Sequence, residues 1–206
     1  MKKGTLNTGG DLLMIFVKNR EVGKVKTRLA KTIGDLNALK IYDVLLKHTK
    51  EVSLNVSCFR MVLYSEYIDF NDIFPNQYFI KDEQNKGDLG DRMKLAFKEN
   101  FKDEFNKILC IGSDCYELDP LHIVQAFEKL DSSDVVIGPA VDGGYYLIGM
   151  KDYNPQLFEN KKWSTSNVLL DTILDLKELR LTYQLLPTLS DVDEIDDLAP
   201  ELKEML

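Results

Sequence analysis

The sequence lacks the cysteine patterns and the long apolar runs that mark several classes of protein. Of its three cysteines, Cys110 and Cys115 show neither a CxxC spacing nor a histidine close enough for a zinc site. We therefore expect reduced, mostly buried thiols, as in a cytoplasmic protein. No apolar run approaches the roughly 20 residues of a membrane span, and residues 1–11 lack the apolar core of a secretory signal. The sequence thus predicts a cytoplasmic protein without a membrane span, in which residues 1–10 form a mobile tail.

Several nucleotide-binding and nucleophile motifs are also missing. No GxxxxGK[ST] motif occurs, because Val25 follows Gly23 and Lys24, and there is no GxGxxG motif. His48 and His122 fall in expected helices, and neither adjoins a GxSxG motif. Serine or cysteine hydrolase chemistry therefore has no support, and nucleotide binding by either of the first two motifs is disfavoured. The formal net charge of −8 argues against general nucleic-acid binding, which needs a broad basic face.

What the sequence does contain is a regular alternation of apolar, β-rich runs with helical periodicity. The run LLMIFV at 12–17 is continuously apolar, as a strand buried on both faces requires. The pair Asp119-Pro120 is typical of a capped helix start. The alternation predicts an α/β fold with a mostly parallel sheet, in one domain spanning residues 1–206. Further strands are expected at 61–65, 77–80, 107–112, 134–138, 144–150 and 182–187, with helices capped by Asp35, by Asp119 and by Ser164 or Thr165, another helix along 89–101, and a helical tail over 193–206.

The unusual loops all follow expected strands. Open parallel sheets bind ligands beyond the carboxyl ends of their strands, so these loops are expected to share one rim of the sheet. They are KNREVGKVKTR after the first strand, NKGDLGDRM after QYFI, GSDCYEL after KILCI, GPAVDGGYY after VVI, and PTLSDVDEIDDL after YQLL.

The first of these loops concentrates positive charge in an acidic chain. Between residues 18 and 31 a single acid, Glu21, faces six basic residues, Lys18, Arg20, Lys24, Lys26, Arg28 and Lys31. Lysine and arginine beside a flexible glycine such as Gly23 can form a phosphate cradle. A solvated charged face is the ordinary alternative. We favour phosphate binding, because the run is out of character with the chain and follows the first strand.

Two acidic loops suggest a divalent cation. Asp114 directly follows a buried strand, where a rigid scaffold can hold a carboxylate against Mg²⁺ or Mn²⁺. Alone, Asp114 would more simply cap a turn. In LSDVDEIDDL, Asp191 and Asp193 point to opposite sides of an extended segment, so only one easily reaches a shared metal. We favour Asp193 as the ligand and Asp191 as a supporting group.

Glycine-rich loops supply the remaining candidates. Gly143 and Gly144 adjoin Asp142, which would face the ligand, although a tight hairpin turn also explains them. Gly87 and Gly90 lie near a helix start, where free N–H groups favour an anion or a base edge, and an ordinary capped turn explains them nearly as well. The one tryptophan, Trp163, is interpreted as a core anchor.

Several motifs in fixed order resemble one bacterial family. FVKNREVGKVKTRLA, GDLGDRM, IGSDC, GPAVDGGYYLIG, WSTSNVL and LPTLSDVDEIDDL are similar to the motifs of GT-A-fold, nucleotide-diphospho-sugar-transferase-like proteins, usually labelled glycosyltransferases, over about residues 12–198. The same superfamily includes molybdenum-cofactor guanylyltransferases and phospholactate guanylyltransferases. Arg20, Tyr116 and Glu194-Ile195 depart from the family pattern, in which prolines occupy or adjoin these sites, and this affects the expected rigidity of the loops.

The resemblance implies a nucleotide-binding, three-layer α/β/α sandwich with Mg²⁺ or Mn²⁺ held by Asp114 and Asp193. It also implies phosphate contacts from Lys18, Lys26 and Arg28. With the glycine-rich loops and their neighbours, the nucleotide- and phosphate-binding candidates are Lys18, Gly23, Lys26, Thr27, Arg28, Gly87, Gly90, Ser113, Gly143 and Gly144.

Two reactions would use the same site. In sugar transfer, Lys26 and Arg28 would stabilise a departing nucleoside diphosphate, and Asp142 would serve as general base for the acceptor hydroxyl. In nucleotidyl transfer, the same charges would stabilise pyrophosphate, and an anionic acceptor would need no base. The family label places glycosyl transfer narrowly ahead, and a non-catalytic nucleotide-sugar-binding protein is a third hypothesis. The expected partners are a nucleotide or nucleotide-sugar and a small acceptor, without nucleic acid.

Overall fold

The computed structural model describes residues 9–102 and 105–206, so most of the predicted tail, residues 1–8, lies outside the described residues. The strands are β1 (Asp11–Val17), β2 (Phe59–Tyr64), β3 (Ile80–Glu83), β4 (Lys107–Ile111), β5 (Val135–Pro139), β6 (Tyr145–Met150) and β7 (Tyr183–Leu185). The α-helices are α1 (Thr27–Ile33), α2 (Asp35–Leu54), α3 (Leu89–Lys102), α4 (Pro120–Lys129), α5 (Val168–Glu178) and α6 (Pro200–Lys203), with 3₁₀ turns η1 (Pro155–Phe158) and η2 (Ile195–Asp197). No helix among the described residues is both long enough and apolar enough to cross a membrane.

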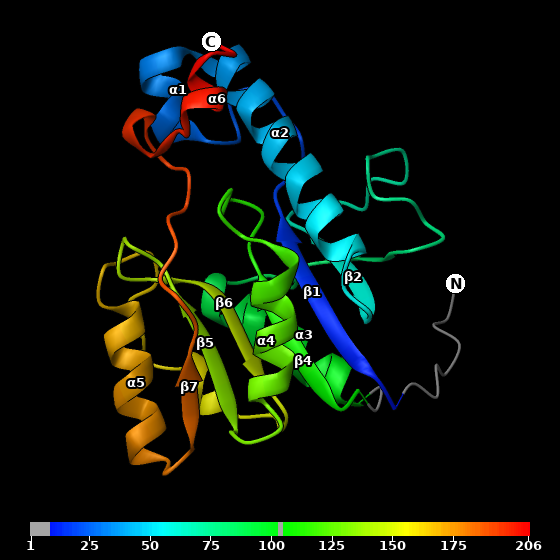
Figure 1. Cartoon of the computed structure of the whole chain (residues 1–206), viewed down its shortest axis with the longest axis vertical. Coiled ribbons are helices and arrows are strands. Elements are labelled where there is room, and N and C mark those ends of the chain that lie inside the picture. Colours follow the sequence, from blue (N-terminus) through cyan, green and yellow to red (C-terminus); the bar gives the residue numbers. More distant parts are fainter. Residues whose placement is uncertain (1–8, 103–104) are drawn as a thin grey trace.

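The strands form one sheet in the order β3-β2-β1-β4-β6-β5-β7. Only β6 runs antiparallel to its neighbours, and the other pairs are parallel. Figure 1 shows helices on both sides of this sheet. The predicted α/β/α sandwich with a mostly parallel sheet is therefore confirmed.

Alternate residues of each buried strand supply two separate cores. On one face, Leu13 and Ile15 of β1 pack with apolar residues of α2 and α4. On the other face, Leu12 and Met14 pack with residues of α3, η1 and α5. A strand covered on both faces must be apolar at nearly every position, which is why the run at 12–17 carried so clear a signal.

A third apolar cluster lies beyond the carboxyl edge of the sheet. It joins α1, the adjacent part of α2 and the C-terminal segment, and Figure 1 shows these elements together at the top of the molecule. Its buried members are Leu29, Ile41, Leu45, Val192, Leu198 and Leu202. This cluster brings the last segment of the chain back to the loop that follows β1.

Two expected boundaries were wrong for local hydrogen-bonding reasons. The strand expected at 77–80 begins only at Ile80, because the N–H groups of Tyr78 and Phe79 donate to the carbonyl of Pro75 in a turn. The helix expected to be capped by Ser164 or Thr165 begins at Val168. The hydroxyl of Thr165 instead donates to the carbonyl of Lys162.

The basic loop and the C-terminal tail also differ from expectation. Residues of the basic loop form the short helix α1, and Gly34, at φ 81°, separates it from α2, so Asp35 is the first helical residue rather than the cap. The tail is helical only in short pieces. Pro200 has no N–H group and disfavours helix in the residue before it, which separates η2 from α6.

The strand order places a switch point between β1 and β4. Strands β2 and β3 lie on one side of β1, whereas β4 begins the other half of the sheet. Crevices at such points are the usual ligand sites of open α/β sheets. The loops after β1, β3, β4, β5 and β7 all leave from this carboxyl edge, as the sequence predicted.

Candidate functional site

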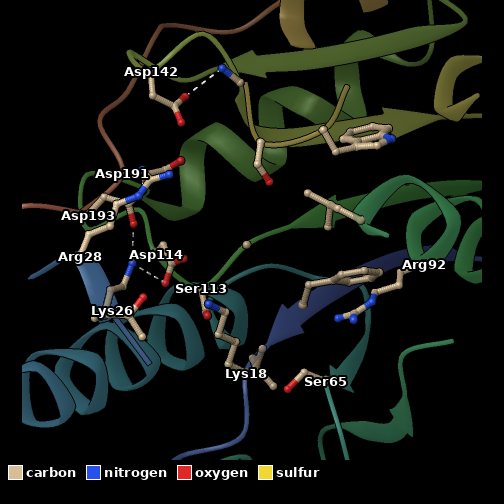
Figure 2. Close-up of a pocket in the computed structure, with 18 of the residues that line it drawn as sticks. Lys18, Lys26, Arg28, Ser65, Arg92, Ser113, Asp114, Asp142, Asp191 and Asp193 are labelled. Atoms are coloured by element: carbon tan, nitrogen blue, oxygen red, sulfur yellow. Dashed lines mark hydrogen bonds and ion pairs between the residues drawn. The ribbon is translucent and has the colours of Figure 1, made fainter. Parts of the chain in front are cut away.

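A cavity of about 860 Å³ lies at the carboxyl edge of the sheet. Figure 2 shows charged side chains converging at one side of it. The predicted candidates that line it are Lys18, Lys26, Thr27, Arg28, Ser113, Asp114, Asp142, Gly144, Asp191 and Asp193. The loops that the sequence placed on one rim therefore meet around one cavity.

Lys26 lies at the centre of the charged group. Its Nζ atom is 2.8 Å from Oδ1 of Asp114 and 3.4 Å from Oδ1 of Asp193, and its side chain is only 3% exposed. Arg28 adds an ion pair to Asp193 at 3.2 Å, from a side chain that is 59% exposed. Two carboxylates from distant parts of the sequence thus share one buried ammonium group.

The backbone explains why these two carboxylates converge. The N–H of Val192 donates to the carbonyl of Asp114 at 2.9 Å, which ties the segment after β7 to the loop after β4. The carboxylate of Asp197 accepts hydrogen bonds from the N–H groups of Asp193 and Glu194. Asp197 is therefore a local cap that fixes the main chain at Asp193.

Asp191 lies in the same electrostatic environment. Burial, followed by the charges of Asp114 and Asp142, raises the pKa of Asp191 to about 7. Like charges close together disfavour the ionised form of each. An additional cation close to Asp191 would stabilise its ionised form.

We expect Asp191→Asn to stabilise the protein more at pH 8 than at pH 5. The raised pKa means that ionised Asp191 opposes folding, so its penalty is absent below about pH 4, grows as pH rises, and is complete above about pH 7. One pKa unit corresponds to about 1.4 kcal/mol, so the gain at pH 8 should reach about 2–4 kcal/mol. Urea unfolding with EDTA measures it. The exposed Asp196→Asn is the control, and an equal gain at both pH values for Asp191→Asn would contradict the assignment.

Tyr42, a residue of α2, positions two of the other site candidates. Its buried hydroxyl donates to the carbonyl of Lys18 at 3.0 Å, accepts from the N–H of Lys18 at 2.9 Å, and lies 3.5 Å from the hydroxyl of Ser113. One side chain therefore links the end of β1 to the loop after β4. Sequence reasoning missed Tyr42, because its apolar helical spacing marked only a core position.

The rest of the basic run serves other purposes. Arg20 forms a bidentate pair with Asp43 of α2, at 2.5 and 2.7 Å. Lys24 lines the cavity but pairs with Glu21 at 2.7 Å and Glu66 at 3.4 Å. The run is thus partly a solvated charged face, the alternative reading of its charge.

Four predicted glycines do not belong to the cavity wall described by the structure, namely Gly23, Gly87, Gly90 and Gly143. They shape the loops instead. A methyl group on Gly90 would lie 2.1 Å from Nε1 of Trp163, and one on Gly143 would lie 2.1 Å from the carbonyl oxygen of Ser166. Phosphate contact at these four positions stays a prediction, and the structure assigns them a role in loop shape.

Asp142 reaches the cavity from the turn between β5 and β6. Its Oδ1 atom accepts the N–H of Gly144 at 2.8 Å, and Figure 2 shows the carboxylate on the upper side of the cavity, across from Lys26 and Asp114. The turn predicted from the sequence is present, and Asp142 lines the cavity, while its contact with a ligand stays a prediction.

Comparison with known proteins places the chain in a family. The family model described as "Uncharacterized protein conserved in bacteria (DUF2064)" matches residues 57–165, more than half of the 206 residues. The chain belongs to this family. A "putative nucleotide-diphospho-sugar transferase" from Desulfovibrio desulfuricans G20 is 30% identical, with a TM-score of 0.83 over 89% of this chain and 82% of that chain. The resemblance seen in the motifs is thereby confirmed, whereas no curated protein matches.

More distant structures share the fold of this DUF2064 protein. The inositol-1-phosphate CTP transferase from T. maritima has 14% identity and a TM-score of 0.62, over 94% of each chain. Glucosyl-3-phosphoglycerate synthase from Mycobacterium tuberculosis, solved with Mn²⁺, UDP and glucosyl-3-phosphoglycerate, has 11% identity and a TM-score of 0.53, over 91% of this chain and 72% of that chain. These likenesses concern the fold alone.

Arg92 marks the other end of the cavity in the DUF2064 protein. Its Nε donates to the carbonyl of Gly87 at 3.0 Å, and its Nη1 donates to Oε1 of Gln84 at 3.3 Å. The amide nitrogen of Gln84 in turn donates to the carbonyls of Val17 and Leu63, at the ends of β1 and β2. Figure 2 shows Arg92 well separated from Lys26. Only its place in the GDLGDRM motif could have signalled it.

Trp163 is a cavity residue as well as a packing residue. Its half-buried ring lies perpendicular to that of Tyr145, with centroids 6.4 Å apart, and both rings line the cavity. The interpretation as a core anchor was therefore incomplete. Both aromatic residues line the same cavity as Arg92.

The acidic residues fit a hard divalent cation that takes part of its coordination from a ligand. The described part of the chain contains no group of three or more His, Cys, Asp or Glu side chains arranged to hold a metal. Asp114 and Asp193 nevertheless converge on one cation, the ammonium of Lys26. Mg²⁺ usually binds one or two carboxylates together with phosphate oxygens and water. The donor chemistry therefore suits Mg²⁺ or Mn²⁺.

Proposed function

We propose that this DUF2064 protein is a divalent-metal-dependent transferase that uses a nucleotide-sugar donor. The observation that carries the proposal is the group formed by Lys26, Arg28, Asp114 and Asp193 at the switch point of the sheet. It combines cations for a diphosphate with carboxylates for a metal, in a cavity large enough for a nucleotide. The name of the relative from Desulfovibrio desulfuricans G20 supports a nucleotide-sugar donor.

The residues divide the work of such a transfer. Lys18, Lys26 and Arg28 would bind the diphosphate and stabilise the negative charge that it gains as the sugar bond breaks. Asp114 and Asp193 would hold Mg²⁺ or Mn²⁺, which supplies Lewis-acid stabilisation of the departing diphosphate. The cavity concentrates these groups on the side where the charge develops.

Asp142 would act on the acceptor. It lies on the opposite side of the cavity from Lys26, and a neutral hydroxyl nucleophile needs a base to take its proton. Its carboxylate keeps one oxygen free of the bond to the Gly144 N–H. Trp163 and Arg92 extend the binding surface beyond the charged group, toward the remainder of the donor.

Ligand binding and turnover test the proposal together. With Mn²⁺, one of the common NDP-sugars at about 100 times its Kd should stabilise the protein by about 2.7 kcal/mol, or about 5–10 °C in Tm for a chain of this size. Slow release of the nucleoside diphosphate should accompany binding. Pyrophosphate release from an NTP with a sugar phosphate would instead favour nucleotidyl transfer. Binding without turnover on any donor would favour a non-catalytic nucleotide-sugar-binding protein, and no shift with any nucleotide would refute the proposal.

A further inference from the structure

Lys26 contacts the same two carboxylates that the proposed function assigns to the metal. The ammonium lies 2.8 Å from Asp114 and 3.4 Å from Asp193, and both contacts are made by the Oδ1 atoms. An oxygen that lies against an ammonium group gives up part of its capacity to bind a second cation. The proposed metal ligands and the proposed phosphate-binding lysine are therefore one connected unit.

The surroundings of Lys26 hold it firmly in this position. Its side chain is 3% exposed, and a buried charge is tolerated only with an opposite charge beside it. Its main chain has φ 47°, in the left-handed region, and its carbonyl accepts the N–H of Ala30 at the start of α1. The neighbouring Val25 is buried at 1% exposure. Lys26 thus cannot relax into solvent as an exposed lysine would, and the carboxylates are its natural partners.

Adding a divalent cation to this group would place like charges together. Like charges a few ångströms apart repel strongly in a partly buried site, and a divalent ion doubles the charge on one side. The carboxyl group of Asp191 lines the same cavity and, where it is ionised, offsets part of this repulsion. The rest must be offset by an anion that takes over the ammonium of Lys26.

A diphosphate is the anion that the cavity is suited to supply. Its oxygens can accept from Lys26 and coordinate a metal at the same time, which gives the ammonium a new partner and frees the carboxylates. We propose that Lys26 competes with the divalent cation for Asp114 and Asp193, and that the diphosphate of the nucleotide ends this competition. Metal and nucleotide then bind as a pair. This inference rests on the proposed function and adds to it that metal binding and nucleotide binding are coupled.

Lys26→Met tests the inference, because it removes the charge but keeps much of the length of the side chain. Mn²⁺ alone, followed by the EPR signal of the free ion, should bind Lys26→Met about tenfold more tightly than the wild type. Pyrophosphate in EDTA, followed by calorimetry, should bind about tenfold more weakly, since tenfold corresponds to the loss of a single charged contact of about 1.4 kcal/mol. A merely structural defect would weaken both. Lys31→Met, which removes an exposed lysine of α1 outside the cavity wall, should match the wild type in both measurements.

An Mn²⁺ affinity of folded Lys26→Met that is equal to or below that of the wild type overturns the inference. If Lys26→Met does not fold, Lys26→Asn replaces it, because asparagine tolerates a positive φ and is too short to reproduce the ammonium contact. Tighter Mn²⁺ binding by the variant without any nucleotide binding by the wild type would leave the competition standing and refute the proposed function. Nucleotide binding by the wild type, together with an unchanged Mn²⁺ affinity in Lys26→Met, would refute the competition and leave the proposed function standing.

Discussion

Asp114→Asn is expected to lower kcat/KM for nucleotide-dependent transfer by about 10²–10³-fold. The substitution keeps the size of the side chain but removes the negative charge that pairs with Lys26 and would bind the metal. Removal of one preorganised electrostatic group from an active site typically costs a factor of this size. Steady-state rates at saturating Mn²⁺, with the donor that gives the largest thermal shift, measure it. A loss of less than about fivefold would show that Asp114 lies outside the chemistry.

The control for this variant is Asp196→Asn. Asp196 is exposed, lies on the same acidic segment as Asp193, and does not line the cavity described by the structure. Removing its charge should leave the rate within about twofold of the wild type. Thermal unfolding of both variants separates loss of chemistry from loss of fold. Asp114→Asn should stay folded, because Asp193 still pairs with Lys26 when Asp114 is changed.

Gly143→Ala should lower the free energy of unfolding by more than about 3 kcal/mol, a large effect for one methyl group. Gly143 has φ +88°, and the added carbon would lie 2.1 Å from the carbonyl oxygen of Ser166, which is backbone and cannot move aside easily. The carbonyl of Gly143 also accepts the N–H of Leu169 at the start of α5. Moving this loop would therefore disturb both the helix and Asp142.

Gly34→Ala separates the two causes of that loss. Gly34 has a similar φ of +81° but nothing within 4 Å of the added carbon. Its cost should be the conformational strain alone, about 1–2 kcal/mol. Urea unfolding of both variants gives the difference, which is the cost of the contact with Ser166. Equal losses would mean that the loop around Gly143 yields without penalty.

The sequence was sufficient to predict the sheet and to predict that the main charged residues of the site lie together. A strand such as 12–17 must be apolar throughout when helices cover both faces of the sheet. The central strands could therefore be recognised from the sequence. The loops that follow parallel strands must share an edge, and this placed Lys26, Asp114 and Asp193 together without any knowledge of their distances. These inferences depend on periodicity and strand direction, which are local properties of the chain.

The remaining details depend on contacts between distant segments. The hydroxyl of Tyr42 bonds to Lys18 across 24 residues, and Gln84 reaches the carbonyl of Val17 across 67. Neither side chain differs in its local pattern from an ordinary helix or loop residue. The helix α1 was hidden because charged residues surround its single buried residue, Leu29, and because Lys26 begins it in a left-handed conformation that lysine rarely adopts.

The small apolar cluster of α1, α2 and the C-terminal segment has an electrostatic consequence. Leu29 and Leu198 carry no charge themselves. They belong, however, to the cluster that also buries Val192, the residue between Asp191 and Asp193. A substitution that leaves this cluster poorly packed would allow Asp191 and Asp193 to move away from Lys26. Such a variant would keep every charged side chain and still behave, in a binding titration, as though a ligand-binding residue had been deleted.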